Sequence, residues 1–333
     1  MRTIGVGVIG CGSVAQFAHL PAYQSAVGVR IVGIADPDAN RLDFMSHRFR
    51  VEKAYRDYHD LLEEGELAAV SVCVPTYLHH EIVVQAAQKG IHVLCEKPLG
   101  RNLEEALDMV TQTRKSHVQL YVGFAARFSR IVKEMMKLLR DDFVCELVSV
   151  QVRIAAKPPP VGSWYLDRER GGGALFDTGA HAADLLLHCF GGGDVSSAAF
   201  EVPSGGDVDV AASVSVSLNS GIGASLDVDW RSRIPLEFTL AVQGKSGNLI
   251  CDLVRSQLRV KGEGIILGKH TNGFTMQVEQ RVPIQWAEIW EFVDSVRNGK
   301  ESDFLASSQE GVNALKLVEA AYRHFPSTTE EQA

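Results

Sequence analysis

An acidic and an imidazole side chain lie four residues apart in the second half of the chain, at Asp177 and His181. On an α-helix this spacing places both side chains on one face. A carboxylate beside an imidazole favours the imidazolium and orients the ring, so such a pair can give or take a proton. The alternative is a purely structural helix pair. We expect no zinc site, because His188 is seven residues further on and no H-E-x-x-H motif occurs.

A lysine in the segment Glu96-Lys97-Pro98 is the second candidate for proton transfer. The segment follows an apolar run that reads as a buried strand, and ligands of doubly wound sheets bind outside the carboxyl ends of strands. A partly desolvated lysine there can have its pKa lowered enough to exchange protons. A surface Glu–Lys pair before a turn is the alternative, and residue chemistry alone favours it.

A glycine-rich motif follows the first apolar run of the chain and precedes a helical pattern: Gly10-Cys11-Gly12-Ser13-Val14-Ala15. It has the form G-x-G-x-x-A. The first glycine allows a tight turn, the second lets the backbone approach a pyrophosphate, and the small last residue lets the helix pack on the strand. The helix N-terminus then offers free N–H groups to the anion. The motif predicts a dinucleotide site made by Gly10, Gly12, Ser13 and Val14.

Asp36 ends the second predicted strand, 24 residues after Gly12. A carboxylate there can accept hydrogen bonds from the ribose hydroxyls of NAD and would repel the extra phosphate of NADP. Arg41 lies nearby and could instead contact that phosphate, so NAD is the predicted cofactor and NADP stays open.

The first third of the chain alternates strand and helix patterns, which is typical of βαβ units and a parallel sheet. The predicted strands are Thr3–Ile9, Arg30–Ala35, Ala69–Val74, His92–Cys95 and Gln119–Phe124. The predicted helices are Val14–Tyr23, Asp38–Phe49, His79–Lys89 and Leu103–Ser116. We therefore expect an α/β fold with an N-terminal Rossmann domain over residues 1–124.

After Phe124 a helix over Ser129–Arg140 is followed by many strand-like runs, several of which alternate polar and apolar residues. Predicted strands are Val144–Ala156, Ala198–Val202, Val208–Leu218, Gly223–Asp229, Phe238–Gln243, Asn248–Leu253, Gln257–Lys261 and Gly273–Arg281. Residues 125–333 are accordingly expected to form an α+β domain for substrate binding and oligomerisation, with a large open, mostly antiparallel sheet.

Taken together, these motifs resemble the Gfo/Idh/MocA family of oxidoreductases over about Thr3–Tyr322. The motifs that carry the resemblance are the glycine-rich turn, Val74-Pro75-Thr76-x-x-His79, Glu96-Lys97-Pro98, Gly123-Phe124-x-x-Arg127-Phe128 and Gly171-Gly172-Gly173-x-x-x-Asp177-x-Gly179-x-His181. The resemblance implies an active site between the domains and an exposed sheet face that pairs subunits into a homodimer or homotetramer.

By resemblance, Lys97, Asp177 and His181 are the catalytic residues. The cofactor would also contact Val74, Pro75, Thr76, His79, Glu96, Lys97, Arg127 and Trp164. The substrate would contact Lys97, Arg127, Arg153, Tyr165, Asp177 and His181. For Trp164 and Tyr165 a loop hydrophobe is the alternative role.

The predicted activity is NAD(P)-dependent hydride transfer between a nicotinamide and a secondary alcohol or ketone of a sugar, nucleotide sugar or cyclic polyol. His181 would take the hydroxyl proton, and Lys97 would donate a hydrogen bond to the same oxygen, although either could be the formal base. The alternatives are a non-catalytic NAD(P)-binding regulator of the same fold and an NAD-assisted glycosidase.

Composition excludes several other classes. The 333 residues carry 33 Lys+Arg against 41 Asp+Glu, a net charge of −8, without a basic stripe for nucleic acid. No apolar run approaches the ~18 residues that span a membrane, and a strand from Thr3 leaves no room for a signal peptide. The six cysteines show no C-x-x-C spacing. We therefore expect a cytoplasmic enzyme that acts on a small molecule.

Overall fold

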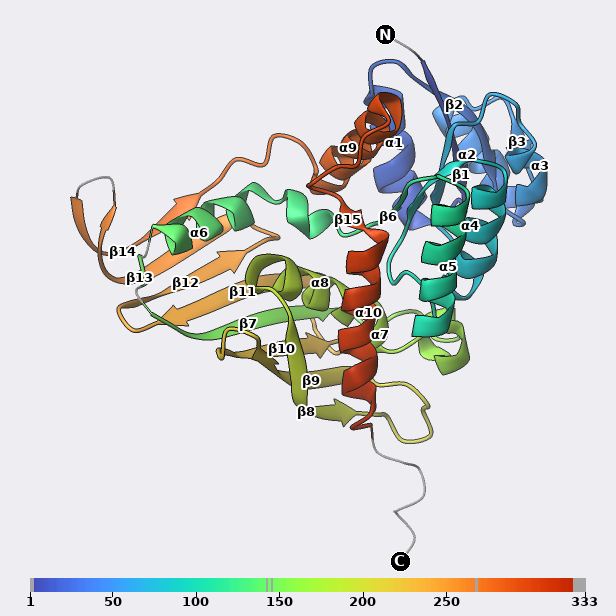
Figure 1. The fold of residues 1–333 in the computed structure, drawn as a ribbon. Helices are drawn as coiled ribbons and strands as arrows, with labels where there is room; N and C mark the ends of the chain where they lie inside the picture. Colours follow the sequence, from blue (N-terminus) through green and yellow to red (C-terminus); the bar gives the residue numbers. More distant parts are fainter. Residues whose placement is uncertain (1–2, 142, 145, 267–268, 326–333) are drawn as a thin grey trace, which may run out of the picture. The chain divides into compact units, whose positions relative to one another are not determined.

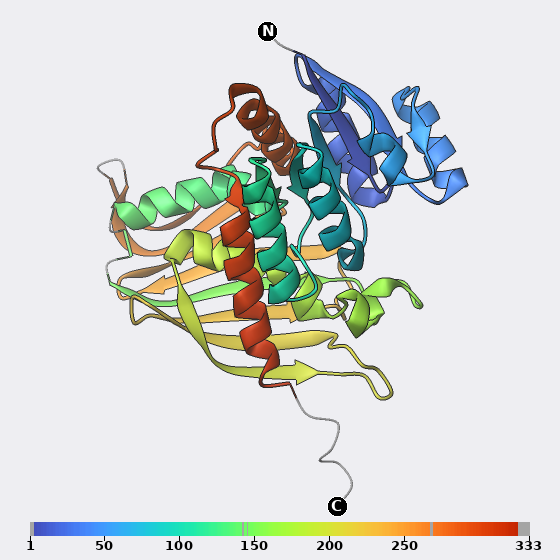
Figure 2. The ribbon, with the colours of Figure 1, turned by 45° about the vertical axis from the view of Figure 1, so that its right-hand side comes forward.

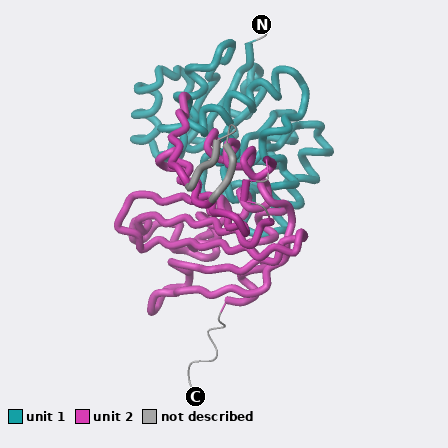
Figure 3. Tube along the Cα trace, turned by 90° about the vertical axis from the view of Figure 1, so that its left-hand side faces the viewer, with its two compact units in different colours: residues 1–128, 282–312 teal, residues 129–281, 313–333 magenta. Residues whose placement is uncertain are grey.

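The computed structural model describes residues 3–141, 143–144, 146–266 and 269–325, so Cys145 lies outside the described residues (Figure 1). The chain forms two compact units. Unit 1 comprises Met1–Phe128 and Val282–Val312, and unit 2 comprises Ser129–Arg281 and Asn313–Ala333 (Figure 3).

Unit 1 is built on a seven-stranded sheet with the order β15-β6-β5-β4-β1-β2-β3. All neighbouring strands are parallel except β15, which pairs antiparallel with β6. Strand order reverses beside β1, which lies between β2 and β4, and ligands of open α/β sheets bind outside the strand ends at such a point. The strands are β1 (Ile4–Ile9), β2 (Val29–Ala35), β3 (Ala54–Tyr55), β4 (Ala69–Val72), β5 (His92–Cys95), β6 (Leu120–Val122) and β15 (Ala306–Ser307).

Two of the longer helices of unit 1 begin where a side chain accepts from the free N–H groups. The Asp38 carboxylate caps α2, and the Asn102 amide oxygen caps α5. The helices are α1 (Leu20–Ser25), α2 (Ala39–Phe49), α3 (Tyr58–Leu62), α4 (His79–Gln88), α5 (Leu103–Lys115), α9 (Ile284–Asn298) and the first residues of α10 (Ser308–Tyr322).

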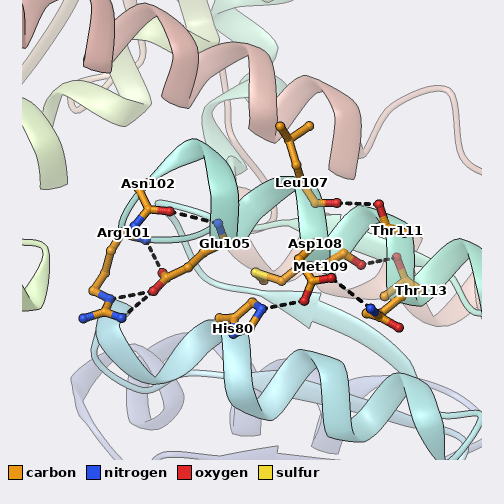
Figure 4. Close-up of polar contacts among 10 residues, drawn as sticks. His80, Arg101, Asn102, Glu105, Leu107, Asp108, Met109, Thr111 and Thr113 are labelled. Carbon is orange, nitrogen blue, oxygen red and sulfur yellow. Dashed lines mark hydrogen bonds and ion pairs between the residues drawn. The ribbon is translucent and has the colours of Figure 1, made fainter.

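Helices α4 and α5 are joined by side-chain contacts near the chain that leaves β5 (Figure 4). His80 Nε2 lies 2.8 Å from Asp108 Oδ2, and Arg101 forms an ion pair with Glu105 one turn into α5. The ion pair of Arg101 and the Asn102 cap of α5 hold the chain where the loop that contains Lys97 leads into α5.

The predicted boundary at Phe124 differs from the division that the structure shows. The chain passes to unit 2 after Phe128, and residues 282–312 return to unit 1. The reason is that α9 packs on α1, with Trp290 Nε1 donating to Ala22 O, and that Tyr121 binds Ser295. Helix α9 is absent from the elements that the sequence pattern predicts.

Unit 2 contains an eight-stranded sheet with the order β14-β13-β12-β11-β7-β10-β9-β8. Only the pair β7–β10 is parallel, so the expectation of a mostly antiparallel sheet is confirmed. The strands are β7 (Leu147–Ala156), β8 (Gly193–Glu201), β9 (Ala211–Leu218), β10 (Gly223–Asp229), β11 (Leu236–Gly244), β12 (Gly247–Asp252), β13 (Gln257–Ile266) and β14 (Lys269–Gln277).

The two faces of this sheet differ in composition. One row of paired residues on the covered face is apolar and buried: Val214, Leu226, Val152, Leu240, Cys251 and Leu258. Helices α6 (Arg130–Arg140) and α8 (Gly179–Phe190) pack on strands of this face (Figure 2). On the opposite face the neighbouring row is Ser215, Ser225, Gln151, Ala241, Ile250 and Arg259. This second row identifies the open face of the sheet.

Candidate active site

The two glycines of the glycine-rich turn differ in the space that a side chain would find at each of them. Gly10 has φ +92°, and a Cβ there would lie 2.4 Å from Cys73 O, so only glycine fits. A Cβ on Gly12 would have no atom within 4 Å. Space is therefore left beside the turn, where the helix that begins at Ser13 presents N–H groups without intrahelical partners. The geometry fits the pyrophosphate of a dinucleotide.

Asp36 connects the end of β2 to this turn. Its buried carboxylate accepts the Cys11 N–H at 2.7 Å through Oδ2 and the Asp38 N–H at 2.9 Å through Oδ1. Each carboxylate oxygen keeps a further lone pair that can accept from a ribose hydroxyl. The half-exposed Arg41 guanidinium lies 3.5 Å from Asp36 Oδ2. Asp36 thus fixes the turn in addition to its predicted contact with the cofactor.

A buried histidine, His79, lies between the backbone carbonyl groups of two loops, one after β4 and one after β5. His79 Nδ1 lies 2.9 Å from Pro98 O and its Nε2 lies 3.0 Å from Val74 O. Burial lowers the pKa of His79, although the two carbonyl groups oppose the fall. Its place between two loops supports a structural role, and its predicted cofactor contact stays a prediction. Thr76 is buried beside Pro75, and its Oγ1 has no hydrogen-bond partner among the described residues.

Glu96 and Lys97 leave the carboxyl end of β5, as the sequence predicted, and both are half-buried. Glu96 Oε1 lies 2.9 Å from Nε2 of the buried His19. A Cβ on Gly123 would lie 3.2 Å from the Glu96 carboxylate, so the absence of a side chain at Gly123 gives that carboxylate its room. Sequence reasoning missed His19, because an isolated histidine among apolar residues carries no motif.

Arg127 is buried in unit 1, with only 3% of its side chain exposed, and its Nη1 lies 2.6 Å from Glu310 Oε1. Burial alone would raise the pKa of Glu310, but Arg127 and the Ser307 N–H lower it. The pair connects the residues after β6 to the start of α10. Arg127 therefore has a structural partner, and its predicted ligand contacts stay predictions.

In unit 2, the three glycines before Asp177 are required by the packing of the loop. A Cβ on Gly172 would lie 2.4 Å from Tyr165 O. Gly173 has φ +114°, and its Cβ would lie 2.6 Å from Asp209 Oδ1 and 2.8 Å from the Tyr322 hydroxyl. The Asp209 carboxylate and the Tyr322 phenol thus occupy the space beside the turn that precedes α7 (Ala174–Asp177).

Asp209 is fully buried and fixes the first turn of α7. Its Oδ2 accepts the Leu175 N–H at 2.8 Å, and its Oδ1 accepts the Tyr322 hydroxyl at 2.5 Å. Burial raises the pKa of Asp209, although these hydrogen bonds oppose the rise. Asp209 and Tyr322 therefore position the helix start that precedes Asp177.

Tyr322→Phe is expected to lower the free energy of unfolding by about 1–3 kcal/mol, because it leaves a buried carboxylate oxygen without its donor. Urea titration followed by circular dichroism measures the loss. Tyr58→Phe is the matched control, since its hydroxyl binds the exposed Glu81, and a loss under about 0.5 kcal/mol is expected there. Equal losses in the two variants would show that the Tyr322 hydroxyl does not support this turn.

Asp177 and His181 stand on successive short helices, because the expected single helix is interrupted at Thr178. Thr178 keeps helical angles (φ −78°, ψ −39°), and its hydroxyl accepts the buried Trp230 Nε1–H at 2.7 Å. Trp230 directly follows β10, so its contact with Thr178 holds the junction between α7 and α8 at the end of that strand. Both candidate catalytic side chains are half-buried in unit 2.

The remaining predicted residues of unit 2 lie in two places. Trp164 and Tyr165 stack with ring centroids 4.0 Å apart, and Tyr165 meets the edge of Trp230. Arg153 pairs in register with Asp227 and has Nε 3.5 Å from Glu237 Oε1. Arg153 therefore belongs to the open face, opposite α8, and the structure does not bring it together with His181. Its substrate contact stays a prediction.

Within the described residues, no helix is long and apolar enough to cross a bilayer, and no three His, Cys, Asp or Glu side chains are grouped to hold a metal ion. A reversal of strand order, a glycine-rich βα turn and an acidic residue at the next strand end together define a dinucleotide-binding α/β protein.

Comparison with known proteins gives the family. Residues 4–124 match "Oxidoreductase family, NAD-binding Rossmann fold", and residues 132–250 match "GFO/IDH/MocA C-terminal domain". The chain is 31% identical to a myo-inositol 2-dehydrogenase of Thermotoga maritima over 95% of this chain and 94% of that protein. It is 26% identical to a D-apiose dehydrogenase of Paraburkholderia graminis, over 95% and 86%.

Among solved structures, levoglucosan dehydrogenase in complex with NADH and levoglucosan matches with a TM-score of 0.86, over 97% of each chain, at 20% identity. That likeness shows the fold. The chain therefore belongs to the Gfo/Idh/MocA family and is an oxidoreductase with an NAD-binding Rossmann domain.

Proposed function

We propose that this protein oxidises a secondary hydroxyl of a sugar or cyclic polyol, or reduces the corresponding ketone. The observation that carries the proposal is the joint presence of Lys97, Asp177 and His181 at ordered strand and helix ends in a chain with a dinucleotide turn. The relatives named myo-inositol 2-dehydrogenase and D-apiose dehydrogenase support this substrate class.

Bound NAD would accept a hydride at the nicotinamide ring. The pyrophosphate would lie beside Gly12 and the helix start at Ser13, and the ribose hydroxyls would donate to Asp36. The Asp36 carboxylate, already held by two backbone N–H groups, favours NAD over NADP because it would repel a phosphate at the ribose. Arg41 is the group that would accommodate NADP if that cofactor is used.

For the substrate, we assign His181 to the hydroxyl proton and Lys97 to the same oxygen, where its ammonium stabilises developing negative charge. Asp177 would orient His181 or bind a neighbouring hydroxyl. The assignment requires Lys97 of unit 1 and His181 of unit 2 to reach one substrate oxygen. Either group can serve as the formal base.

The test is a dehydrogenase screen of inositols, free sugars and nucleotide sugars with NAD⁺ and NADP⁺, following absorbance of the reduced nicotinamide. We expect turnover with at least one polyol or sugar and a preference for NAD⁺. Tight NAD⁺ binding without turnover on any compound in either direction would contradict the proposal and favour the regulator. Glycoside cleavage without net reduction would favour the glycosidase.

We further propose a homodimer or homotetramer formed through the open face of the unit 2 sheet. Four residues of the row on this face, Ser215, Ser225, Gln151 and Ala241, are small or uncharged and lie on adjacent strands, which suits face-to-face packing of a second copy. Charged side chains of the same face, Arg153 and Glu237, already form an ion pair with each other. Ser215→Arg is expected to shift the mass measured by light scattering toward the monomer. Thr111→Arg, on exposed α5, is the control. An unchanged mass in Ser215→Arg would place the interface elsewhere.

A cytoplasmic location is also proposed. Its support is that five cysteines of the described residues are free thiols and four of them are buried, a state that reducing compartments maintain. Fractionation of the source cells followed by immunoblotting tests this location.

A further inference from the structure

Beneath the Glu96-Lys97-Pro98 loop runs a chain of hydrogen-bonded side chains that the proposed mechanism does not use. The Tyr23 hydroxyl lies 2.6 Å from Ser71 Oγ, Ser71 Oγ lies 2.8 Å from His19 Nδ1, and His19 Nε2 lies 2.9 Å from Glu96 Oε1. Tyr23 and His19 are 1% exposed and Ser71 is 0% exposed. A buried polar network of this kind specifies positions closely when its members are satisfied.

The local fold places His19 in this network. The helix after the glycine-rich turn contains a π-helical segment, Ala15–His19, closed by the Leu20 N–H donating to Ala15 O. Ala18, His19 and Leu20 are all buried, because this helix lies between the sheet and α9. Inserted turns of this type often occur at functional sites. Here the turn directs the imidazole into the core, whereas the side chain of Phe17 is 67% exposed.

The chain of hydrogen bonds ends on the Glu96 carboxylate. Because a carboxylate accepts, His19 donates to Glu96 Oε1 through Nε2–H. The other ring nitrogen, Nδ1, is hydrogen-bonded to the Ser71 hydroxyl, which is hydrogen-bonded to the Tyr23 hydroxyl. Burial raises the pKa of Tyr23, so its hydroxyl stays protonated at neutral pH. Three buried side chains thus lead to one carboxylate oxygen.

The opposite side of Glu96 is confined as well. Gly123 follows β6, and any side chain there would press on the carboxylate. Lys97 is the next residue, and the following Pro98 carbonyl is held by His79. Glu96 is therefore the charged group whose position is fixed directly beside the proposed catalytic lysine.

We propose that His19 is a positioning residue for the reaction: it engages one oxygen of Glu96 and thereby limits how strongly this carboxylate can pair with Lys97. This inference rests on the proposed function only in giving Lys97 a role at the substrate. A carboxylate released from His19 could turn both oxygens toward the neighbouring ammonium. Because an opposite charge at close range favours the charged form, Lys97 would then hold its proton to higher pH.

The buried ionisable groups that interact with Glu96 include two thiols and a second histidine. Cys73 at the end of β4 and Cys95 in β5 interact with Glu96, and burial raises the pKa of both thiols well above the usual range. His79 also interacts with Glu96, and burial lowers its pKa. His19 differs from these neighbours because it is hydrogen-bonded to the Glu96 carboxylate, and a single substitution of His19 removes that hydrogen bond.

The experiment measures the titration of the Lys97 amine in the full chain with excess NAD⁺. Trace acetylation with acetic anhydride is quantified by mass spectrometry of the Lys97 peptide across pH, so no substrate is needed. His19→Asn keeps a group near the Nδ1 position and loses the contact with Glu96, whereas His19→Gln supplies a donor near the Nε2 position. We expect His19→Asn to raise the Lys97 midpoint by about one pH unit. His19→Gln and Tyr23→Phe should stay within a few tenths of a unit of wild type.

Two further variants test whether His19 acts on Lys97 through Glu96. Glu96→Gln should lower the Lys97 midpoint, and His19→Asn should have no further effect in that background, as in a double-mutant cycle. An unchanged midpoint in His19→Asn, equal shifts in His19→Asn and His19→Gln, or no response to Glu96→Gln would each overturn the proposal. Turnover retained by both Lys97→Met and His181→Asn would instead overturn the proposed function, while the amine titration of the lysine-containing chain would still report on His19.

With a substrate from the screen, the kcat–pH profile of His19→Asn should move to higher pH by the same amount while KM changes little. A merely structural role would lower activity without moving that profile.

Discussion

Replacing Lys97 by methionine, or His181 by asparagine, is expected to lower kcat by about 10²- to 10⁴-fold, the usual contribution of a positioned acid–base group. Methionine keeps the length of the lysine stem without the ammonium, and asparagine retains a polar group that cannot exchange a proton near neutral pH. The dissociation constant of NAD⁺ should change little in His181→Asn, because His181 is assigned to the substrate hydroxyl and the dinucleotide to the glycine-rich turn and Asp36. Initial rates of nicotinamide reduction with the substrate from the screen measure the effect.

Matched controls come from surface ion pairs of the same residue types. Lys89→Met removes an ion pair with the exposed Glu63, and His80→Asn removes the contact with Asp108 on α5. Both should keep kcat within about twofold of wild type, because surface pairs contribute little. Near-normal turnover in both Lys97→Met and His181→Asn would show that the acid–base assignment is wrong. A loss in only one of them would identify the formal base.

The local parts of the site could be predicted from the sequence. The turn around Gly10 and Gly12 is encoded within a few residues, because a positive φ and an open Cβ position each demand a glycine there. Strands His92–Cys95 and Gly223–Asp229 match the prediction, since short apolar or alternating runs between turn residues carry a local signal.

The contacts that position the site join residues far apart in sequence, and no local pattern encodes them. His19 and Glu96 are 77 residues apart, Asp209 and Tyr322 are 113 apart, and Arg127 and Glu310 are 183 apart. Each pairs a polar residue with a partner that only the fold supplies. The same reason explains α9, whose packing on α1 the sequence pattern did not reveal and which places residues 282–312 in unit 1.

The three glycines before Asp177 show how a motif can be recognised without its cause. In the sequence they are part of a motif that carries the family resemblance, and the structure adds that Asp209 and Tyr322 occupy the space a side chain at Gly173 would need. Packing inside unit 2 therefore explains the glycines of this motif. Their link to catalysis is indirect, because this packing fixes the start of the helix that carries Asp177.

Gly12→Ala is expected to weaken NAD⁺ binding about 10- to 100-fold, a loss of roughly 1.4–2.8 kcal/mol, while the free protein keeps its stability. The added methyl group enters the open space beside the turn, where the pyrophosphate would lie. It meets no protein atom, so the free energy of unfolding without cofactor should stay the same or rise by up to about 1 kcal/mol. Fluorescence titration with NAD⁺ and thermal unfolding measure the two quantities.

Gly10→Ala should behave in the opposite way, because its Cβ would lie 2.4 Å from Cys73 O at a φ of +92°. A loss of about 2–4 kcal/mol in stability is expected even without cofactor. Gly65→Ala is the control, since its Cβ also meets no atom but lies in the loop before β4. If Gly12→Ala bound NAD⁺ as tightly as Gly65→Ala, the pyrophosphate could not lie at this turn. If Gly10→Ala were as stable as both, the close approach of β1 and the end of β4 would not be what requires glycine there.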